Sequence, residues 1–271
     1  MGHLQSNGAR IYYEVEGGGH PLVLIHAGVA NLRMWDEQMP ALARHYRVIR
    51  YDTRGFGETR TEDVEFSNRA DLAALLDHLK CESAHVLGAS RGGSIALDFT
   101  LEFPGRVDAL VFVAGGIGGF EPEVDPQTTA MFEEADRRWE AHDWDWLTDF
   151  ETAYWVDGPG QPSNRVDPDI RRRVEQWIAA NYRKELIEGQ PQPLDPKANG
   201  RLSEIRVPTL VMVGDLDEAG TQEAGRHLVA AVADSHLEVF EGAAHMLGLE
   251  QPERFNRSVL DFLSEVEARR I

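Results

Sequence analysis

The fold is decided by residues 85–103, which read HVLGASRGGSIALDFTLEF. The run His85-Val86-Leu87 is short and apolar, as a buried strand is, and the stretch from Ser94 to Phe103 reads as a helix. Between them, residues 88–93 read GASRGG and contain the pattern G-x-S-x-G. A serine on a tight turn between a strand and a helix is exposed above the end of a sheet. We therefore expect Ser90 to be a nucleophile.

The residues around Ser90 suit that chemistry. Gly88 and Gly92 are small, as they must be where the backbones of a strand and a helix crowd together. The start of the helix directs free N–H groups and a positive dipole end at the turn, where they would stabilise an oxyanion. We expect the N–H of Arg91, the residue after the serine, to be one oxyanion donor. A second donor should come from Gly28, after the run Leu22–Ile25, or from Val29 if the loop is shifted by one residue.

A serine hydroxyl needs a base, and His245 is the best placed of the ten histidines. It lies in a loop just after an apolar run, Leu237–Phe240, and loops that follow parallel strands gather at one edge of the sheet. His26 also ends a strand, but we interpret it as a structural residue of its loop. The base needs a carboxylate to orient it. Asp215 and Asp217, both directly after the run Leu210–Val213, fit that role almost equally.

Around this stretch, apolar runs alternate with helical patterns. This alternation predicts an α/β fold with a mostly parallel central sheet flanked by helices. A hairpin at Asn7-Gly8 should precede the sheet. The expected strands are Ile11–Val15, Leu22–Ile25, Arg47–Tyr51, His85–Leu87, Val107–Ala114, Pro208–Val213 and Leu237–Phe240. The expected helices outside the insertion described next are Trp35–Arg44, Leu72–Leu79, Ser94–Phe103 and Pro252–Glu267.

The strand pattern stops between residues 115 and 200, where tryptophans stand among many charged residues. We expect a core domain made of residues 1–114 and 201–271, and a helical cap inserted as residues 115–200. Most of the tryptophans should pack the small core of this cap. Trp155 and Met246 are our candidates for residues that line a substrate pocket between cap and sheet.

Composition limits the function further. The chain has 271 residues and a formal net charge of −19. An acidic surface repels phosphates, so we expect neither nucleic acid nor a membrane as partner. No apolar run approaches the ~20 residues that cross a bilayer, and the first residues lack the pattern of a secretory signal, so we expect a cytoplasmic protein. Cys81 is the only cysteine and forms no internal disulfide. Both a monomer and a homodimer fit the sequence. No pattern of metal ligands or phosphate loops is present, so we expect no metal and no cofactor.

Taken together, the motifs resemble the α/β-hydrolase superfamily. The matching segments, which follow one another along most of the chain, are residues 24–28 (LIHAG), 51–57 (YDTRGFG), 88–93 (GASRGG), 207–211 (VPTLV), 214–217 (GDLD) and 242–245 (GAAH). The resemblance implies a catalytic triad of Ser90, Asp217 and His245, because the second acid of the G-D-x-D segment usually has that role in the family. It also implies that the insertion is the family's cap.

The sequence also departs from the family pattern. Arg91 stands where a methionine or a small residue often follows the serine. We expect its side chain to point into the packing between sheet and helix rather than toward an anionic substrate. Relatives that use an aspartate nucleophile, such as haloalkane dehalogenases, are set aside because Ser90 occupies that position.

The resemblance is strongest to serine carboxylesterases and to enol-lactonases of the 3-oxoadipate type. It implies hydrolysis of carboxylic esters or lactones with small to medium acyl or aryl groups, through an acyl-enzyme intermediate. Two alternatives stay open. One is a carbon–carbon bond hydrolase of aromatic degradation, and the other is a ligand receptor that keeps the triad and turns over slowly.

Overall fold

The computed structural model of the chain describes residues 1–183 and 188–269. Its main sheet has the strand order β1-β2-β4-β3-β7-β8-β10-β11. Neighbours from β4 to β11 run parallel: β4 (Arg47–Tyr51), β3 (Pro21–Ile25), β7 (Ala84–Ala89), β8 (Val107–Val113), β10 (Thr209–Gly214) and β11 (Ser235–Phe240). The predicted mostly parallel sheet is confirmed.

One edge of this sheet is antiparallel. β1 (Gly2–Ser6) and β2 (Ala9–Glu16) form the hairpin that the sequence predicts, with Asn7 and Gly8 at positive φ angles of 31° and 71°. β2 pairs antiparallel with β4 and also with the short β5 (Arg60–Thr61). A separate two-stranded pair joins β6 (Glu65–Phe66) to β9 (Gln190–Pro191).

Apolar side chains on both faces of the sheet explain its helical layers. In β3, Leu22 and Leu24 belong to one buried cluster, whereas Val23 and Ile25 belong to the other. Successive side chains of a strand point to opposite faces, so an uninterrupted apolar run marks a strand that is covered twice. The first cluster includes side chains of α1 (Met39–Leu42), α8 (Leu247–Glu250) and α9 (Pro252–Ala268). The second includes side chains of α2 (Asn68–His78), α3 (Arg91–Glu102) and α7 (Ala219–Ala231).

The helix that the sequence predicts over Trp35–Arg44 is not formed as one piece. A 3₁₀ turn covers Leu32–Trp35, and a separate short helix, α1, begins at Met39. Pro40 is the reason, because a proline in a helix interior removes a hydrogen bond and clashes with the carbonyl four residues earlier. It is tolerated only in the first turn, where it lies in α1. Two further 3₁₀ turns cover Pro104–Arg106 and Ala198–Glu204.

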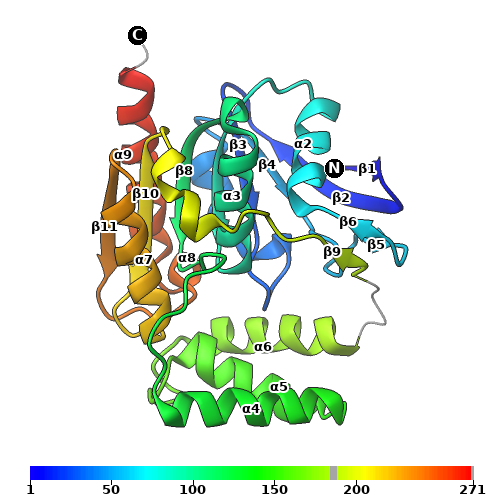
Figure 1. Cartoon of the computed structure of the whole chain (residues 1–271), viewed down its shortest axis with the longest axis vertical. Helices are drawn as coiled ribbons and strands as arrows, with labels where there is room; N and C mark the ends of the chain where they lie inside the picture. The colour runs from blue at the N-terminus through cyan, green and yellow to red at the C-terminus, as the bar shows by residue number, and fades with distance from the viewer. Residues whose placement is uncertain (184–187, 270–271) are drawn as a thin grey trace.

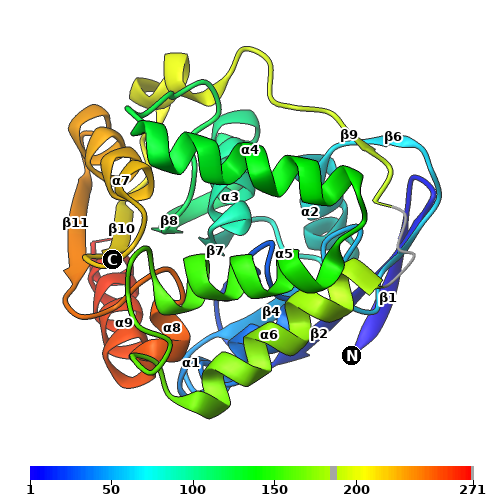
Figure 2. The same ribbon diagram turned by 90° about the horizontal axis from the view of Figure 1, so that it is seen from below.

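Between β8 and residue 183, the end of the first described range, the chain forms three α-helices and a π-helical turn, which we call the helical layer. They are α4 (Pro126–Glu140), α5 (Trp144–Glu151), the π turn Thr152–Asp157 and α6 (Pro168–Arg183). Figure 1 shows this layer below the sheet, and Figure 2 shows the three helices lying across it. The predicted boundaries of the cap, residues 115–200, remain a prediction.

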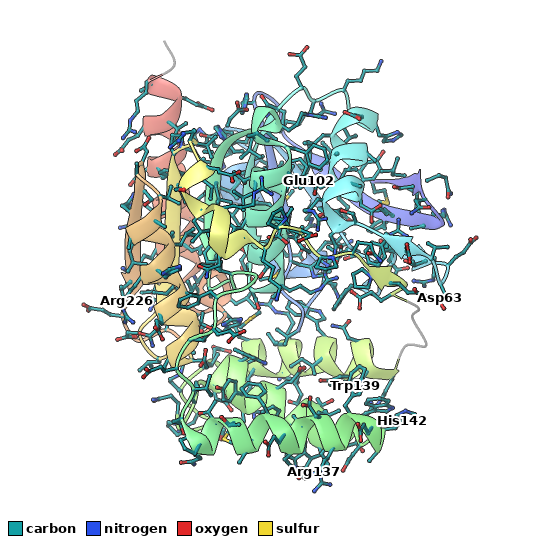
Figure 3. All side chains as sticks on the ribbon, in the orientation of Figure 1. Asp63, Glu102, Arg137, Trp139, His142 and Arg226 are labelled. Atoms are coloured by element: carbon teal, nitrogen blue, oxygen red, sulfur yellow. The ribbon has the colours of Figure 1, made fainter. Side chains whose placement is uncertain are left out.

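Aromatic side chains hold the helical layer together. The ring of Trp144 lies 5.3 Å from that of Trp139 and 5.5 Å from that of Tyr182, so α4, α5 and α6 share one aromatic cluster. Trp139 and its neighbour His142 are labelled at one end of the layer in Figure 3. No helix within the described part of the chain is both long enough and apolar enough to cross a bilayer.

Candidate active site

Ser90 occupies a strained turn between two regular elements. β7 ends at Ala89, α3 begins at Arg91, and Ser90 has φ 53° and ψ −119°. L-residues rarely adopt positive φ, and such strain concentrates at functional sites. The Ser90 N–H donates to the Val113 carbonyl at 2.8 Å, which fixes the turn to β8. The Ser90 side chain makes no capping bond to α3, so its hydroxyl is not used in holding the helix.

The glycines beside Ser90 are required by packing. A Cβ atom at Gly88 would lie 2.0 Å from the Gly92 carbonyl oxygen. A Cβ atom at Gly92 would lie 2.3 Å from the carbonyl oxygen of Ile25, the last residue of β3. Neither approach is possible for real atoms, so any side chain at these positions would push α3 away from the strands. The crowding expected from the sequence is therefore present, and it holds Ser90 above the ends of β3 and β7.

His245 and Asp217 are in direct contact. The imidazole Nδ1 lies 2.8 Å from Oδ2 and 3.0 Å from Oδ1 of Asp217, and both side chains are buried. The Glu218 N–H also donates to the Asp217 carboxylate at 2.8 Å. Asp215, the other candidate acid, instead accepts the Gly242 N–H at 2.7 Å and so supports the loop that carries His245. With Nδ1 held by the Asp217 carboxylate, Nε2 is left to act as a base.

The structure does not join all three candidate residues. Ser90 follows β7 and His245 follows β11, so both lie at the carboxyl edge of the sheet. No direct hydrogen bond connects these two described residues, and the transfer of a proton from Ser90 to His245 stays a prediction. Catalytic hydrogen bonds are often long without substrate and tighten only in the reacting complex.

His26 is excluded as a base by its environment. It is fully buried, and its Nδ1–H donates to the Ala27 carbonyl at 2.8 Å. Its Nε2 accepts the Thr53 N–H at 3.1 Å, so both ring nitrogens are engaged. Burial lowers the pKa of His26 to about 3, because the charged form is deprived of water. His26 is thus a neutral, structural residue, as the sequence suggested.

The two expected oxyanion donors lie on adjoining segments. Arg91 is the first residue of α3, where backbone N–H groups have no partner within the helix. Gly28 faces it: a Cβ atom built at Gly28 would lie 3.7 Å from the Arg91 Cβ atom. Val29, the alternative donor, is packed in the apolar core. Gly28 and Arg91 remain our candidates for the oxyanion hole.

The side chain of Arg91 does not point where the sequence analysis expected. Its guanidinium donates to the Thr53 hydroxyl at 2.7 Å and to the Glu188 carboxylate at 2.6 Å, and it lies 4.8 Å above the ring of Phe56. The expected position between sheet and helix is therefore wrong. The reason is that Thr53, Glu188 and Phe56 provide partners for the guanidinium outside that packing.

A cavity of about 420 Å³ lies between the sheet edge and the helical layer. Gly28, Gly55 and Phe56 line it on the sheet side. The helical layer contributes Phe132, Trp139, Phe150, Trp155 and Tyr182, among others. The ring of Trp155 lies 4.5 Å from that of His245, so the cavity adjoins the candidate triad. Of the two predicted pocket residues, Trp155 lines this cavity, whereas Met246 lies in the apolar core at 2% exposure.

Sequence reasoning missed a largely buried ion pair that supports the His245 loop. The carboxylate of Glu250 accepts the N–H groups of Ala244 at 3.1 Å and Met246 at 3.2 Å, on either side of His245. Arg165, from the loop between the π turn and α6, pairs with Glu250 at 2.5 Å. No motif marks either residue, because the pairing depends on two segments 85 positions apart.

Arg165 also ties this loop to the helical layer. It donates to the carbonyl oxygens of Val156 at 2.7 Å, Asp157 at 2.6 Å and Gly242 at 2.9 Å. Val156 and Asp157 end the π turn that carries Trp155. One guanidinium therefore fixes the position of the imidazole loop relative to the wall of the cavity.

Comparison with known proteins agrees with the observed fold. A family profile described as "alpha/beta hydrolase fold" matches residues 20–153. A protein of Pseudomonas putida, the 2-hydroxy-6-oxononadienedioate/2-hydroxy-6-oxononatrienedioate hydrolase 2, is 31% identical over 265 residues. That alignment covers 93% of this chain and 90% of the relative.

Two solved structures show the same architecture. Est816, described as an N-acyl homoserine lactone degrading enzyme, has a TM-score of 0.76 and 26% identity, and the match covers 96% of this chain and 99% of that one. The enol-lactonase from Burkholderia xenovorans LB400 also has a TM-score of 0.76, with 22% identity and coverage of 97% and 99%. At that identity the second likeness concerns the fold alone.

Proposed function

Since the chain belongs to the α/β-hydrolase family of enzymes, we propose that it hydrolyses carboxylic esters or lactones with small to medium acyl or aryl groups. The observation that carries this proposal is the buried His245–Asp217 pair at the same sheet edge as the strained Ser90 turn. Such a set of nucleophile, base and orienting acid activates a serine for attack on an acyl carbon. A small molecule, rather than a polymer, suits a cavity of about 420 Å³.

In the proposed reaction, the Ser90 hydroxyl oxygen attacks the carbonyl carbon while Nε2 of His245 takes its proton. The Asp217 carboxylate, 2.8 Å from Nδ1, stabilises the imidazolium that forms. The carbonyl oxygen becomes an oxyanion, which the N–H groups of Gly28 and Arg91 bind. One such donor is worth about 3–4 kcal/mol in the transition state.

The intermediate then collapses to an acyl-enzyme. The bond to the alcohol oxygen breaks as His245 returns its proton to that oxygen, and the alcohol leaves. Water attacks the acyl-Ser90 ester with His245 again as base, which releases the acid and restores the hydroxyl. For a lactone, the alcohol and the acid belong to one molecule, so a single hydroxy acid is released.

A second candidate function rests on the Pseudomonas putida relative. The name of that relative specifies a 6-oxo dienedioate, which has a ketone and no ester, so its hydrolysis breaks a carbon–carbon bond. At 31% identity over nearly the whole chain, this likeness makes a carbon–carbon hydrolase at least as well supported as an esterase. The same Ser90, His245 and Asp217 could serve either reaction.

Steady-state turnover of matched substrates tests the proposal. We expect multiple turnover of p-nitrophenyl acetate and p-nitrophenyl butyrate by the wild-type protein. Ser90→Ala should abolish it while circular dichroism and the melting temperature show a folded chain. Poor ester turnover together with fast cleavage of a vinylogous diketone would favour the carbon–carbon reaction instead. A single slow turnover would favour the receptor, and full activity of Ser90→Ala would refute the serine mechanism.

A further inference from the structure

The cavity beside the candidate triad has a carboxyl group in its aromatic wall. Glu151 is the last residue of α5 and lines the cavity together with Tyr182 of α6. The Tyr182 hydroxyl interacts with the Glu151 carboxyl and lowers its pKa, against the larger effect of burial. A carboxylate can accept several hydrogen bonds, so Tyr182 alone does not use its acceptor capacity.

Glu151 is costly to keep for structural reasons alone. Burial raises the pKa of Glu151 to about 7, because the wall around it is mainly apolar. A glutamine would offer Tyr182 an acceptor oxygen without the cost of a buried charge. A perturbed carboxyl in a cavity next to a candidate nucleophile points to a binding role.

The charges around the cavity disfavour an anionic substrate. Among the described lining residues, Asp136, Glu151 and Glu188 are acidic, and none is basic. Arg91 stands behind this wall, but Glu188 already pairs with its guanidinium at 2.6 Å. A substrate carboxylate placed here would find no basic side chain among the described lining residues to pair with.

The aromatic rings favour the opposite kind of group. Phe132, Phe150 and Trp155 line the same cavity as Glu151, and ring faces attract cations. They also provide apolar contact for the body of an acyl or aryl group. The wall thus combines an apolar surface with one hydrogen-bond acceptor that can carry a negative charge.

We propose that this cavity binds the non-reacting part of the substrate. This part is apolar or aromatic and ends in a hydroxyl or an ammonium group, which donates a hydrogen bond to Glu151. The proposal rests on the serine-hydrolase function proposed above. It separates this chain from the Pseudomonas putida relative, whose named substrate is a dioate with a carboxylate at each end.

The test uses p-nitrophenyl esters of phenylpropanoic acid that differ only at the para position of the ring. The four substituents are methyl, hydroxymethyl, aminomethyl and carboxylate. We expect kcat/KM for the hydroxymethyl and aminomethyl esters to exceed that for the carboxylate ester by about tenfold or more, as one charge-assisted hydrogen bond provides. Glu151→Gln should reduce the advantage of the aminomethyl ester by about tenfold, whereas Glu140→Gln, an exposed carboxyl of α4, should leave it unchanged.

Binding to Ser90→Ala separates the two proposals. The affinity of the intact esters for this variant, measured by quenching of tryptophan fluorescence, should follow the same order without any turnover. If no ester is hydrolysed by the wild type but the order of affinities holds, the esterase function fails and the pocket proposal stands. Equal affinity for the carboxylate and aminomethyl esters, or an unchanged preference in Glu151→Gln, would overturn the pocket proposal.

Discussion

Removing the carboxyl group of Glu250 should damage both stability and catalysis. Its side chain is 5% exposed, pairs with Arg165 at 2.5 Å, and accepts the N–H groups on both sides of His245. Glu250→Ala leaves the guanidinium of Arg165, which is 13% exposed and still bonded to three carbonyl oxygens, without its counter-charge. Breaking this pair should cost about 3 kcal/mol, the low end of the cost for a buried pair. Glu250→Gln keeps one acceptor oxygen for the loop, so it should cost about 1–3 kcal/mol.

The catalytic effect should differ from a general loss of stability. If the His245 loop loses its support, the imidazole is misplaced, and a shift of about 1 Å can cost about 10²-fold in rate. We expect kcat to fall in Glu250→Ala with little change in KM, since the cavity wall is left in place. Glu250→Gln should have a kcat much closer to that of the wild type than Glu250→Ala has, which a purely structural role would not require.

Urea unfolding and ester kinetics measure these effects together. Arg172→Met is the matched control, because its pairing with Asp169 is exposed on both sides and such pairs contribute about 0–1 kcal/mol. The double variant Arg165→Met/Glu250→Ala should be less destabilised than the sum of its two single variants, since neither charge is then left alone. Our reasoning is wrong if Glu250→Ala is no less stable than Arg172→Met, or if its kcat equals that of the wild type.

Three further variants test other parts of the site. Asp217→Asn should lower kcat by about 10⁴-fold, whereas Asp215→Asn, which affects only the bond to Gly242, should retain most activity; equal losses would contradict the assignment. Gly92→Ala should destabilise the chain by about 3 kcal/mol or more, because its Cβ would lie 2.3 Å from the Ile25 carbonyl oxygen, and Gly105→Ala, with open space around it, is the control. The pKa of Glu151 is about 7 in the folded state against an ordinary 4.5, so the folded chain holds this proton up to a higher pH than the unfolded chain does. The contribution of this group to folding stability is therefore complete below about pH 4.5 and is lost as the pH rises through about 7. Glu151→Gln should therefore gain up to about 3 kcal/mol relative to wild type on going from pH 5 to pH 8 in urea unfolding, and a constant difference would show that the carboxyl is not perturbed.

The sequence predicts the centre of the sheet well because the central strands are buried on both faces. In runs such as Leu22–Ile25 and Ala109–Val113 every residue is apolar, a pattern typical of a strand that is covered on both faces. The turn at Ser90 is equally visible, since only glycine fits at positions 88 and 92. These features are local, so one segment of the chain is enough to identify them.

The parts that could not be predicted depend on contacts between distant segments. The direction of the Arg91 side chain is set by Glu188, 97 positions away, and no local pattern reports on that pairing. The choice of Asp217 over Asp215 needed a family resemblance, because both acids follow β10 and only their orientations differ. The support that Arg165 gives to the His245 loop has the same origin.

The bonds of Arg165 also limit how this enzyme can be recombined with its relatives. A chimera that exchanges residues 115–200 as a cassette would carry Arg165 into a recipient whose own histidine loop must offer a carboxylate where Glu250 stands. A recipient without that partner would receive an unpaired guanidinium beneath its catalytic base. Grafts that transplant Arg165 and residues 242–250 together keep both halves of the contact, and they are the better starting point for engineering new specificity.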